Sequence, residues 1–137
     1  MNTDDCCPDE ELRDLPQSFR HEHDVLQAAG LNTWPSLKDL DDRTLSRLVR
    51  NGRASARNLY RLRGMAFLVC DLNLAPQDAA LLMHAGIASC EALAACTPER
   101  LVRQTGRLER SLGVNRPSVV DLRLAQIWIL KARQLMN

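Results

Sequence analysis

Aromatic residues are scarce in this chain of 137 residues, and two hallmarks of other protein classes are missing. Phe, Trp and Tyr make up 4% of the sequence, so the core must be built mainly from Leu, Ala, Val and Ile, which favours helices over a β-sandwich. No apolar run reaches the roughly 18 residues that a membrane-spanning helix requires. The first residues are acidic and polar, unlike a secretory signal peptide. We therefore expect a cytoplasmic protein with no membrane partner.

The cysteines contain no C-x-x-C motif, which argues against a zinc ribbon or a redox pair. The adjacent Cys6 and Cys7 precede His21 and His23, but two histidines two positions apart face different sides of a helix. Three other cysteines lie in apolar helical patterns, where Cys commonly serves as a small buried residue; they are Cys70, Cys90 and Cys96. We predict reduced thiols and no metal site.

Catalytic motifs are also missing. The sequence has no nucleophile elbow, no H-E-x-x-H, no P-loop and no Gly-rich dinucleotide turn. His84 lies one turn before Gly86 and is interpreted as a surface or half-buried helix residue. The sequence therefore predicts a protein that is not an enzyme, binds no cofactor and takes no small-molecule substrate.

Acidic and basic residues are unevenly distributed along the chain. Residues 1–24 hold eight acids and two bases, whereas the remaining residues hold 16 bases and nine acids. A basic body favours a polyanion as partner, and an acidic leader at 1–17 is predicted to be disordered. The leader would then either compete for the basic surface or simply be solvated.

Two stretches of the sequence read alike. They are LQAAGLNTWPSLKDLDDRTL at Leu26–Leu45 and LMHAGIASCEALAACTPERL at Leu82–Leu101, with a constant offset of 56 residues. This indicates an internal duplication, with repeats at 18–73 and 74–137 that pack into one compact unit. The two most apolar helices, Ser55–Leu72 and Pro117–Met136, are predicted to form a central pair about a pseudo-two-fold axis.

Start and stop signals divide each repeat into four helices. The predicted N-caps are Thr33, Asp41 or Asp42, Ser55, Ser89 and Thr97, and Pro35, Pro76, Pro98 and Pro117 suit first turns. The predicted breaks between helices are Gly30, Gly52, Gly86 and Gly113.

Each repeat thus contains two units of helix, tight turn and helix, and LVRNGRASARNLYRLRGMA is a second hairpin of the first repeat. Together with the two stretches above, this segment resembles the helix-hairpin-helix superfamily. The scheme, over Ser18–Leu135, is also similar to an uncharacterised bacterial family of tandem helix-hairpin-helix proteins. The resemblance implies an all-α fold and DNA binding without sequence preference, through turn N–H groups that approach a phosphate.

The sequence departs from the superfamily pattern at one position of every turn. The second Gly is replaced by Asn32, Ala54, Ala88 and Asn115. A side chain at this position limits how closely a phosphate can approach the turn. Two roles therefore stay open for the remaining glycines: they only end helices, or they also help to hold a ligand. The predicted turn residues of the first hairpins are Gly30, Leu31, Asn32, Gly86, Ile87 and Ala88.

The second hairpins carry the strongest basic signal. Arg43–Cys70 contains seven arginines and no acid, namely Arg43, Arg47, Arg50, Arg53, Arg57, Arg61 and Arg63. Arginine suits bidentate phosphate contacts, although the same residues would also form the solvated faces of amphipathic helices. The predicted nucleic-acid-binding residues are Arg47, Arg50, Gly52, Arg53, Arg57, Arg61, Arg103, Arg107, Arg110, Gly113 and Arg116.

A second hypothesis is a protein-interaction scaffold or adaptor that docks an acidic protein partner. Trp34 and Tyr60 would be its aromatic anchors unless they belong to the core or its rim.

Overall fold

A computed structural model of the chain describes residues 12, 15, 17–50, 52–109 and 120–136. Within these residues the protein forms helices and loops without a β-strand, which confirms the all-α class. A 3₁₀ turn at Gln17–Phe19 precedes the α-helices. Their bounds are Arg20–Ala28 (α1), Trp34–Lys38 (α2), Asp42–Leu48 (α3), Ala56–Leu72 (α4), Pro76–His84 (α5), Cys90–Ala94 (α6), Pro98–Glu109 (α7) and Leu122–Met136 (α8).

Short polar side chains begin most of these helices, as predicted. The side chains of Thr33, Asp41, Ser55 and Ser89 each accept a hydrogen bond from the backbone N–H three residues later. Thr33 and Ser36 cap each other reciprocally at the start of α2. Such caps satisfy N–H groups that the first turn leaves without a partner.

The last helix starts later than predicted. Val120 and Asp121 are not helical, and α8 begins at Leu122. The Asp121 carboxylate accepts a hydrogen bond from the Leu124 N–H at 2.8 Å, so this residue acts as the N-cap. Pro117, the predicted start, lies outside the described residues. Asp121 was not among the predicted N-caps.

The helix order repeats with the offset found in the sequence. The first residues of α1, α2 and α3 are Arg20, Trp34 and Asp42, and those of α5, α6 and α7 are Pro76, Cys90 and Pro98. Each pair differs by the 56 residues of the sequence offset. The duplication therefore extends from sequence letters to helix boundaries.

Gly30 and Gly86 end α1 and α5 in the same way. Both have a positive φ, 77° and 90°, which glycine adopts without steric cost. The N–H groups of Leu31 and Ile87, one residue later, each donate at 2.8 Å to a carbonyl in the last turn, at Leu26 and Leu82. This is the Schellman geometry, so both glycines act as helix C-caps.

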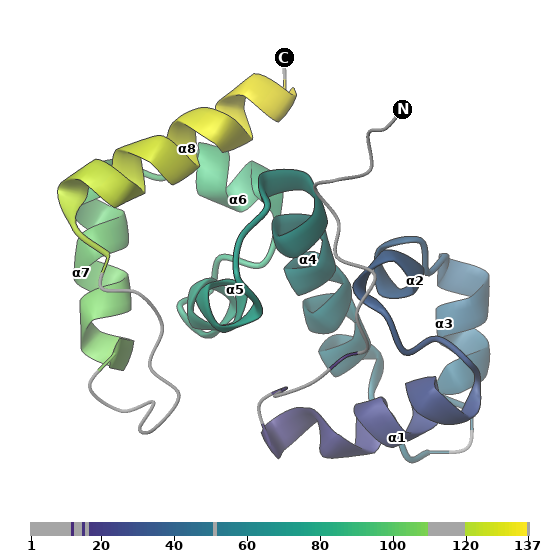
Figure 1. Cartoon of the computed structure of the whole chain (residues 1–137). Helices are drawn as coiled ribbons and strands as arrows, with labels where there is room; N and C mark the ends of the chain where they lie inside the picture. The colour runs from purple at the N-terminus through teal and green to yellow at the C-terminus, as the bar shows by residue number, and fades with distance from the viewer. Residues whose placement is uncertain (1–11, 13–14, 16, 51, 110–119, 137) are drawn as a thin grey trace.

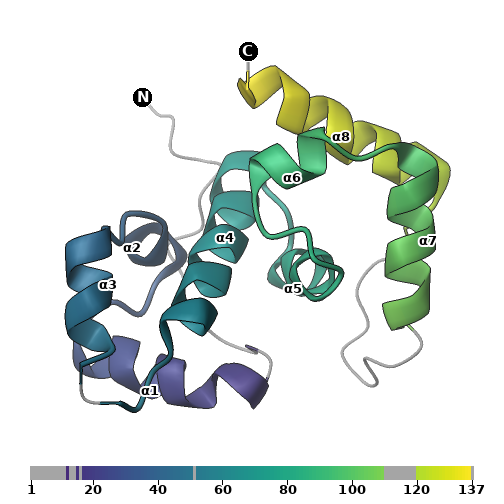
Figure 2. The same ribbon diagram turned by 180° about the vertical axis from the view of Figure 1, so that it is seen from behind.

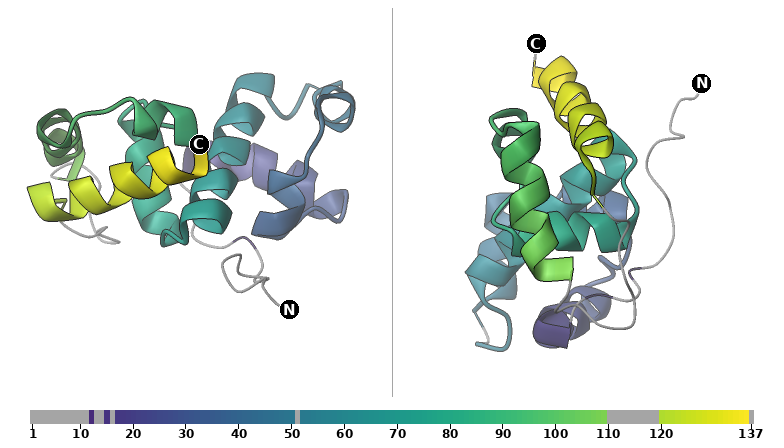
Figure 3. Two further views of the ribbon diagram at one scale, coloured as in Figure 1. Left: turned by 90° about the horizontal axis from the view of Figure 1, so that it is seen from above. Right: turned by 90° about the vertical axis from the view of Figure 1, so that its left-hand side faces the viewer.

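Helix α4 lies at the centre of the molecule, with α1, α2 and α3 on one side and α5 to α8 on the other (Figure 1). The view from behind shows the same order reversed (Figure 2). Seen from above, α3 and α7 lie at opposite ends of the molecule (Figure 3, left). The repeats therefore sit side by side along one direction.

The prediction that α4 and α8 form a central pair is wrong. Helix α4 packs mainly against α2 and α5, whereas α8 packs against α6 and α7 and makes only a minor contact with α4. Helix α8 buries Ala125, Trp128, Ile129 and Ala132. An apolar sequence shows that a helix face is buried, but it does not show which helix covers it.

Two expectations about the leader and the cysteines change. Leu12 is 3% exposed, and its N–H donates to the Asn32 carbonyl at 2.7 Å. The predicted disorder therefore does not hold at Leu12; most of the other leader residues lie outside the described part of the chain.

Cys70 is buried, as expected, but it is disulfide-bonded, so the prediction of a reduced thiol is wrong there. The fold rather than local spacing brings cysteines within bonding distance.

Candidate nucleic-acid interface

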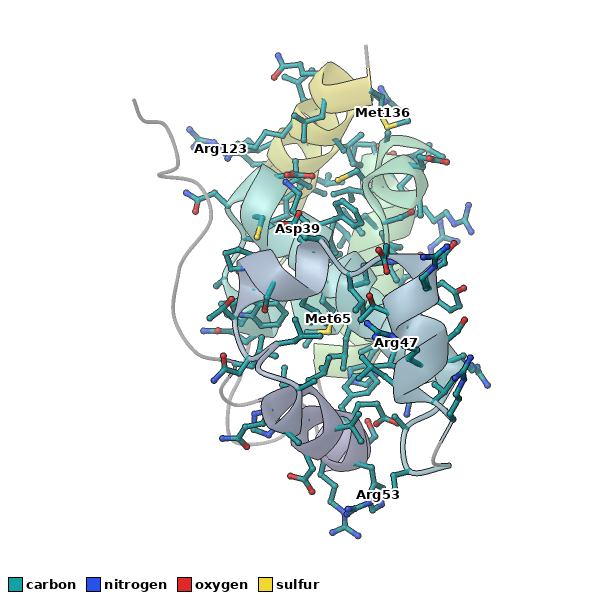
Figure 4. All side chains as sticks on the ribbon, turned by 90° about the vertical axis from the view of Figure 1, so that its right-hand side faces the viewer. Asp39, Arg47, Arg53, Met65, Arg123 and Met136 are labelled. Carbon is teal, nitrogen blue, oxygen red and sulfur yellow. The ribbon has the colours of Figure 1, made fainter. Side chains whose placement is uncertain are left out.

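Five exposed arginines cover α3, the turn after it and the start of α4. We call this set the arginine surface: Arg43, Arg47, Arg50, Arg53 and Arg57. Figure 4 shows Arg47 on α3 and Arg53 below it on the same side of the molecule. The turn between the two helices bends at Gly52, whose φ is 81°. The surface thus follows the second hairpin of the first repeat.

Most of these arginines are not neutralised by an acid. Among the described residues, no ion pair involves Arg43, Arg47, Arg50 or Arg57. Asp41, the N-cap of α3, is among the acids nearby. Hydrogen bonds from Thr44 chiefly lower the pKa of Asp41, and the charges of Arg43 and Arg47 lower it further. Asp41 therefore stays ionised as the cap of α3, and the surface keeps a net positive charge.

A shallow hollow of about 290 Å³ opens between α1 and α3. Arg47 and Arg53 lie on its wall with Asp24, and Val25 and Leu48 are among its apolar lining residues. Two members of the arginine surface, Arg47 and Arg53, therefore line the same hollow as the acidic residue Asp24.

The other two arginines of the predicted run have different surroundings. Arg63 donates at 2.7 Å to the Leu40 carbonyl and at 3.1 Å to the Asp42 carboxylate. Arg61 is half-buried and close enough to His84 of α5 to lower the pKa of that imidazole, second to the effect of burial. Arg63 is thus structural, because the fold brings Asp42 to a segment that contains no acid of its own.

The turn N–H groups are already engaged. Those of Gly30 and Gly86 donate to carbonyls of α1 and α5, and that of Gly52 donates to the carbonyl of Val49, the C-cap of α3, all at 3.0 to 3.1 Å. The Ser55 N–H, at the start of α4, donates to the Glu22 carboxylate at 2.9 Å. These donors are occupied by the fold, which supports the role of the glycines as helix ends and leaves the arginine side chains as the groups that face solvent.

The first hairpins are packed as well as hydrogen-bonded. Leu31, Asn32 and Ala88 are half-buried and Ile87 is buried. A Cβ atom added to Gly64 of α4 would lie 1.9 Å from the Ala88 carbonyl oxygen, so helix and turn touch directly.

The second repeat does not extend the arginine surface. Arg103 is exposed on α7, at the opposite end of the molecule from α3 (Figure 1). Arg100 and Gln104 line a separate hollow of about 250 Å³ next to Gly86. The side chain of Arg107 lies outside the described residues, as do Arg110, Gly113 and Arg116. The structure therefore brings together only the predicted site residues of the first repeat.

Sequence reasoning missed one buried acid, Glu22. Glu22 is 3% exposed; one carboxylate oxygen accepts from the Ser55 N–H, and the other has no hydrogen-bond partner among the described residues. Its counterpart 56 residues later, Asp78, is also buried. An acid at equivalent positions of both repeats was the sequence signal that could have revealed Glu22.

The two predicted aromatic anchors differ in exposure. Trp34 is 2% exposed and belongs to the core, whereas Tyr60 is 47% exposed.

Residues 16–135 match the model of a family described as a domain of unknown function, DUF4332. The chain belongs to this family. The matched span includes both repeats, so the DUF4332 domain comprises the duplicated unit as a whole. No curated protein and no solved structure matches the chain.

Metal-binding clusters and membrane-spanning helices are both missing from the described part of this DUF4332 protein. No group of three or more His, Cys, Asp or Glu residues there is placed to hold a metal ion. None of its described helices has the length and apolar character needed to cross a membrane.

Proposed function

We propose that this DUF4332 protein is a non-enzymatic module that binds nucleic acid without sequence preference through the arginine surface. We further propose that its repeats are tandem helix-hairpin-helix units related by a pseudo-two-fold axis. The repeated helix boundaries and the paired Schellman turns support the second statement.

The observation that carries the proposal is the exposure of the arginines together with the lack of ion pairs, within the described part of the chain, at Arg43, Arg47, Arg50 and Arg57. Four cations without an ion pair among the described residues lie on two adjoining helices and the turn between them. Guanidinium groups match the geometry of phosphate oxygens and remain charged at all physiological pH values. Contacts to the phosphate backbone fix position but carry no sequence information, which accounts for the absence of sequence preference.

The test compares two double variants that remove the same charge. Arg47→Gln with Arg50→Gln removes two members of the arginine surface; Arg123→Gln with Lys131→Gln removes two exposed cations from α8. We expect the first variant to bind a labelled 20-base-pair duplex roughly tenfold or more weakly and the second to bind like the wild type. Equal affinities for the two variants, or no duplex binding by the wild type, would contradict the proposal.

A second candidate function is protein interaction, and α8 is the observation that favours it. Five of the large hydrophobic side chains that are exposed among the described residues lie on this helix: Leu122, Ile127, Leu130, Leu135 and Met136. The helix contains three basic residues and no acid. A second copy would therefore bring like charges together, and the occupant that fits is an acidic amphipathic helix of a protein partner.

Nucleic-acid binding and protein binding can be tested separately, because the arginine surface and the exposed face of α8 share no residue. An acidic amphipathic peptide should bind the wild type and the Arg47→Gln/Arg50→Gln variant equally. It should lose affinity for a variant that carries Ile127→Ser and Leu130→Ser. Equal binding of the peptide to the α8 variant would eliminate this candidate.

A further inference from the structure

Tyr60 is the aromatic side chain that α4 presents to solvent. Its residue is 47% exposed, whereas Trp34, Trp128 and Phe19 are buried in the core. Helix α4 buries most of its large apolar side chains, including Leu59 and Leu62, and half-buries Phe67. Tyr60 is therefore the aromatic residue of this helix with the most surface open to a ligand.

The ring is supported from one side. The Arg63 guanidinium carbon lies 4.9 Å from the centre of the Tyr60 ring, which is a cation–π distance. Arg63 is itself fixed by the Leu40 carbonyl and the Asp42 carboxylate. Because Arg63 is anchored at Leu40 and Asp42, the Tyr60 ring is held in place before any ligand arrives.

Tyr60 also adjoins the arginine surface. Arg57 precedes it by three residues on the same helix and therefore shares its face. Arg57 is exposed and, among the described residues, in no ion pair. An aromatic platform and a phosphate-binding cation thus stand one helical turn apart, which is the combination that single-strand binding sites use.

We propose that Tyr60 is a stacking platform for an unpaired nucleobase, with Arg57 on the adjacent phosphate. The proposal rests on the proposed function and adds a second ligand class to the duplex, namely single-stranded nucleic acid. A base inside a duplex has both faces covered by its neighbours and is not accessible to the ring. Every base has a π-face, so the platform is indifferent to sequence.

The test uses a labelled 12-nucleotide single strand and, in parallel, a labelled 20-base-pair duplex. Tyr60→Ala removes the platform, Tyr60→Phe keeps the ring, and Leu130→Ala truncates an exposed apolar side chain on α8 as a matched control. We expect Tyr60→Ala to weaken single-strand binding about five- to 100-fold. We expect Tyr60→Phe and Leu130→Ala to stay within about twofold of the wild type, and duplex affinity to change little.

Two results would overturn the stacking site. One is wild-type affinity of Tyr60→Ala for the single strand, and the other is an equal loss in Tyr60→Phe, which would implicate the hydroxyl instead of the ring. If duplex binding still depends on Arg47 and Arg50 in either case, only the stacking site fails. If the wild type binds neither ligand, the proposed function fails and the stacking site fails with it.

Discussion

At the scale of single residues, one missing side chain allows α4 to pass against the turn at Ala88. Gly64 is buried, and its helix touches the Ala88 backbone where any larger residue would place a Cβ atom. Backbone atoms cannot swing aside as the end of a flexible side chain does. The contact joins a helix of the first repeat to a turn of the second, so this glycine determines how closely the repeats approach.

Gly64→Ala should therefore lower the free energy of unfolding by about 3 kcal/mol, because the new methyl group overpacks a backbone contact. Gly106→Ala in α7 is the matched control. Nothing lies within 4 Å of a Cβ there, and alanine should stabilise that helix by roughly 0.5–1 kcal/mol. Urea unfolding followed by circular dichroism measures both, and equal effects of the two substitutions would contradict the close contact.

His84 gives a pH dependence with a defined sign. Burial first, and then the Arg61 charge, lower its pKa below the usual 6.5. The unfolded chain therefore takes up the proton at a higher pH than the folded one. The stability associated with His84 is complete above pH 6.5 and is lost as the pH falls through 6.5 towards the folded value.

We expect the melting temperature of the wild type to drop more between about pH 7.5 and pH 5.5 than that of His84→Gln. Differential scanning calorimetry at both pH values measures the two drops. A drop in His84→Gln as large as that of the wild type would exclude this histidine as a source of acid sensitivity.

At the scale of elements, a carboxylate on α1 fixes the start of α4. Glu22 accepts from the Ser55 N–H, and the Ser55 side chain accepts from Asn58. The central helix is thus tied to the first helix of its repeat at its N-terminus.

Glu22→Ala should cost about 1–3 kcal/mol of stability, because it leaves the Ser55 N–H without its acceptor in a partly buried site. Glu22→Gln keeps an oxygen at this position and should retain most of that stability. Thermal unfolding of the two variants distinguishes them. An alanine variant as stable as the wild type would show that water replaces the carboxylate at no cost.

Local signals predicted the elements well, and long-range contacts account for what was missed. The caps at Thr33, Ser55 and Ser89 operate within one turn, so three or four letters specify them. The Arg63–Asp42 pair joins residues 21 positions apart, and no local pattern reveals it. Likewise, periodicity showed that α8 has a buried face but did not show that α6 and α7 cover it. Within the candidate site, exposure of the arginines was predictable from helical spacing, and the separation of the two repeats' arginines was not.

At the scale of the whole molecule, the acidic leader and the arginine surface carry charges of opposite sign, so the proposed nucleic-acid ligand would be repelled by one and attracted by the other. Residues 1–11 contain five acids and no base, whereas Leu12 belongs to the core. Substitution of these five acids by Asn and Gln therefore removes the negative charge while keeping the chain length, Leu12 and every cysteine.

This neutralised variant should bind the duplex more strongly than the wild type at low salt, because repulsion between the leader and phosphate is strongest there and is screened by added salt. Its melting temperature should stay nearly unchanged. Fluorescence anisotropy titrations at about 50 mM and 200 mM salt measure the effect. Unchanged affinity at low salt would contradict a role for the leader in binding, and a large loss of stability would show that residues 1–11 support the fold.

The salt dependence of duplex affinity tests the central claim most directly. Four phosphate contacts predict a slope of about −3.6 for the logarithm of the association constant against the logarithm of the salt concentration. The Arg47→Gln/Arg50→Gln variant should be shallower by about two. A wild-type slope near zero, or the same slope in both proteins, would show that the arginine surface does not bind phosphate.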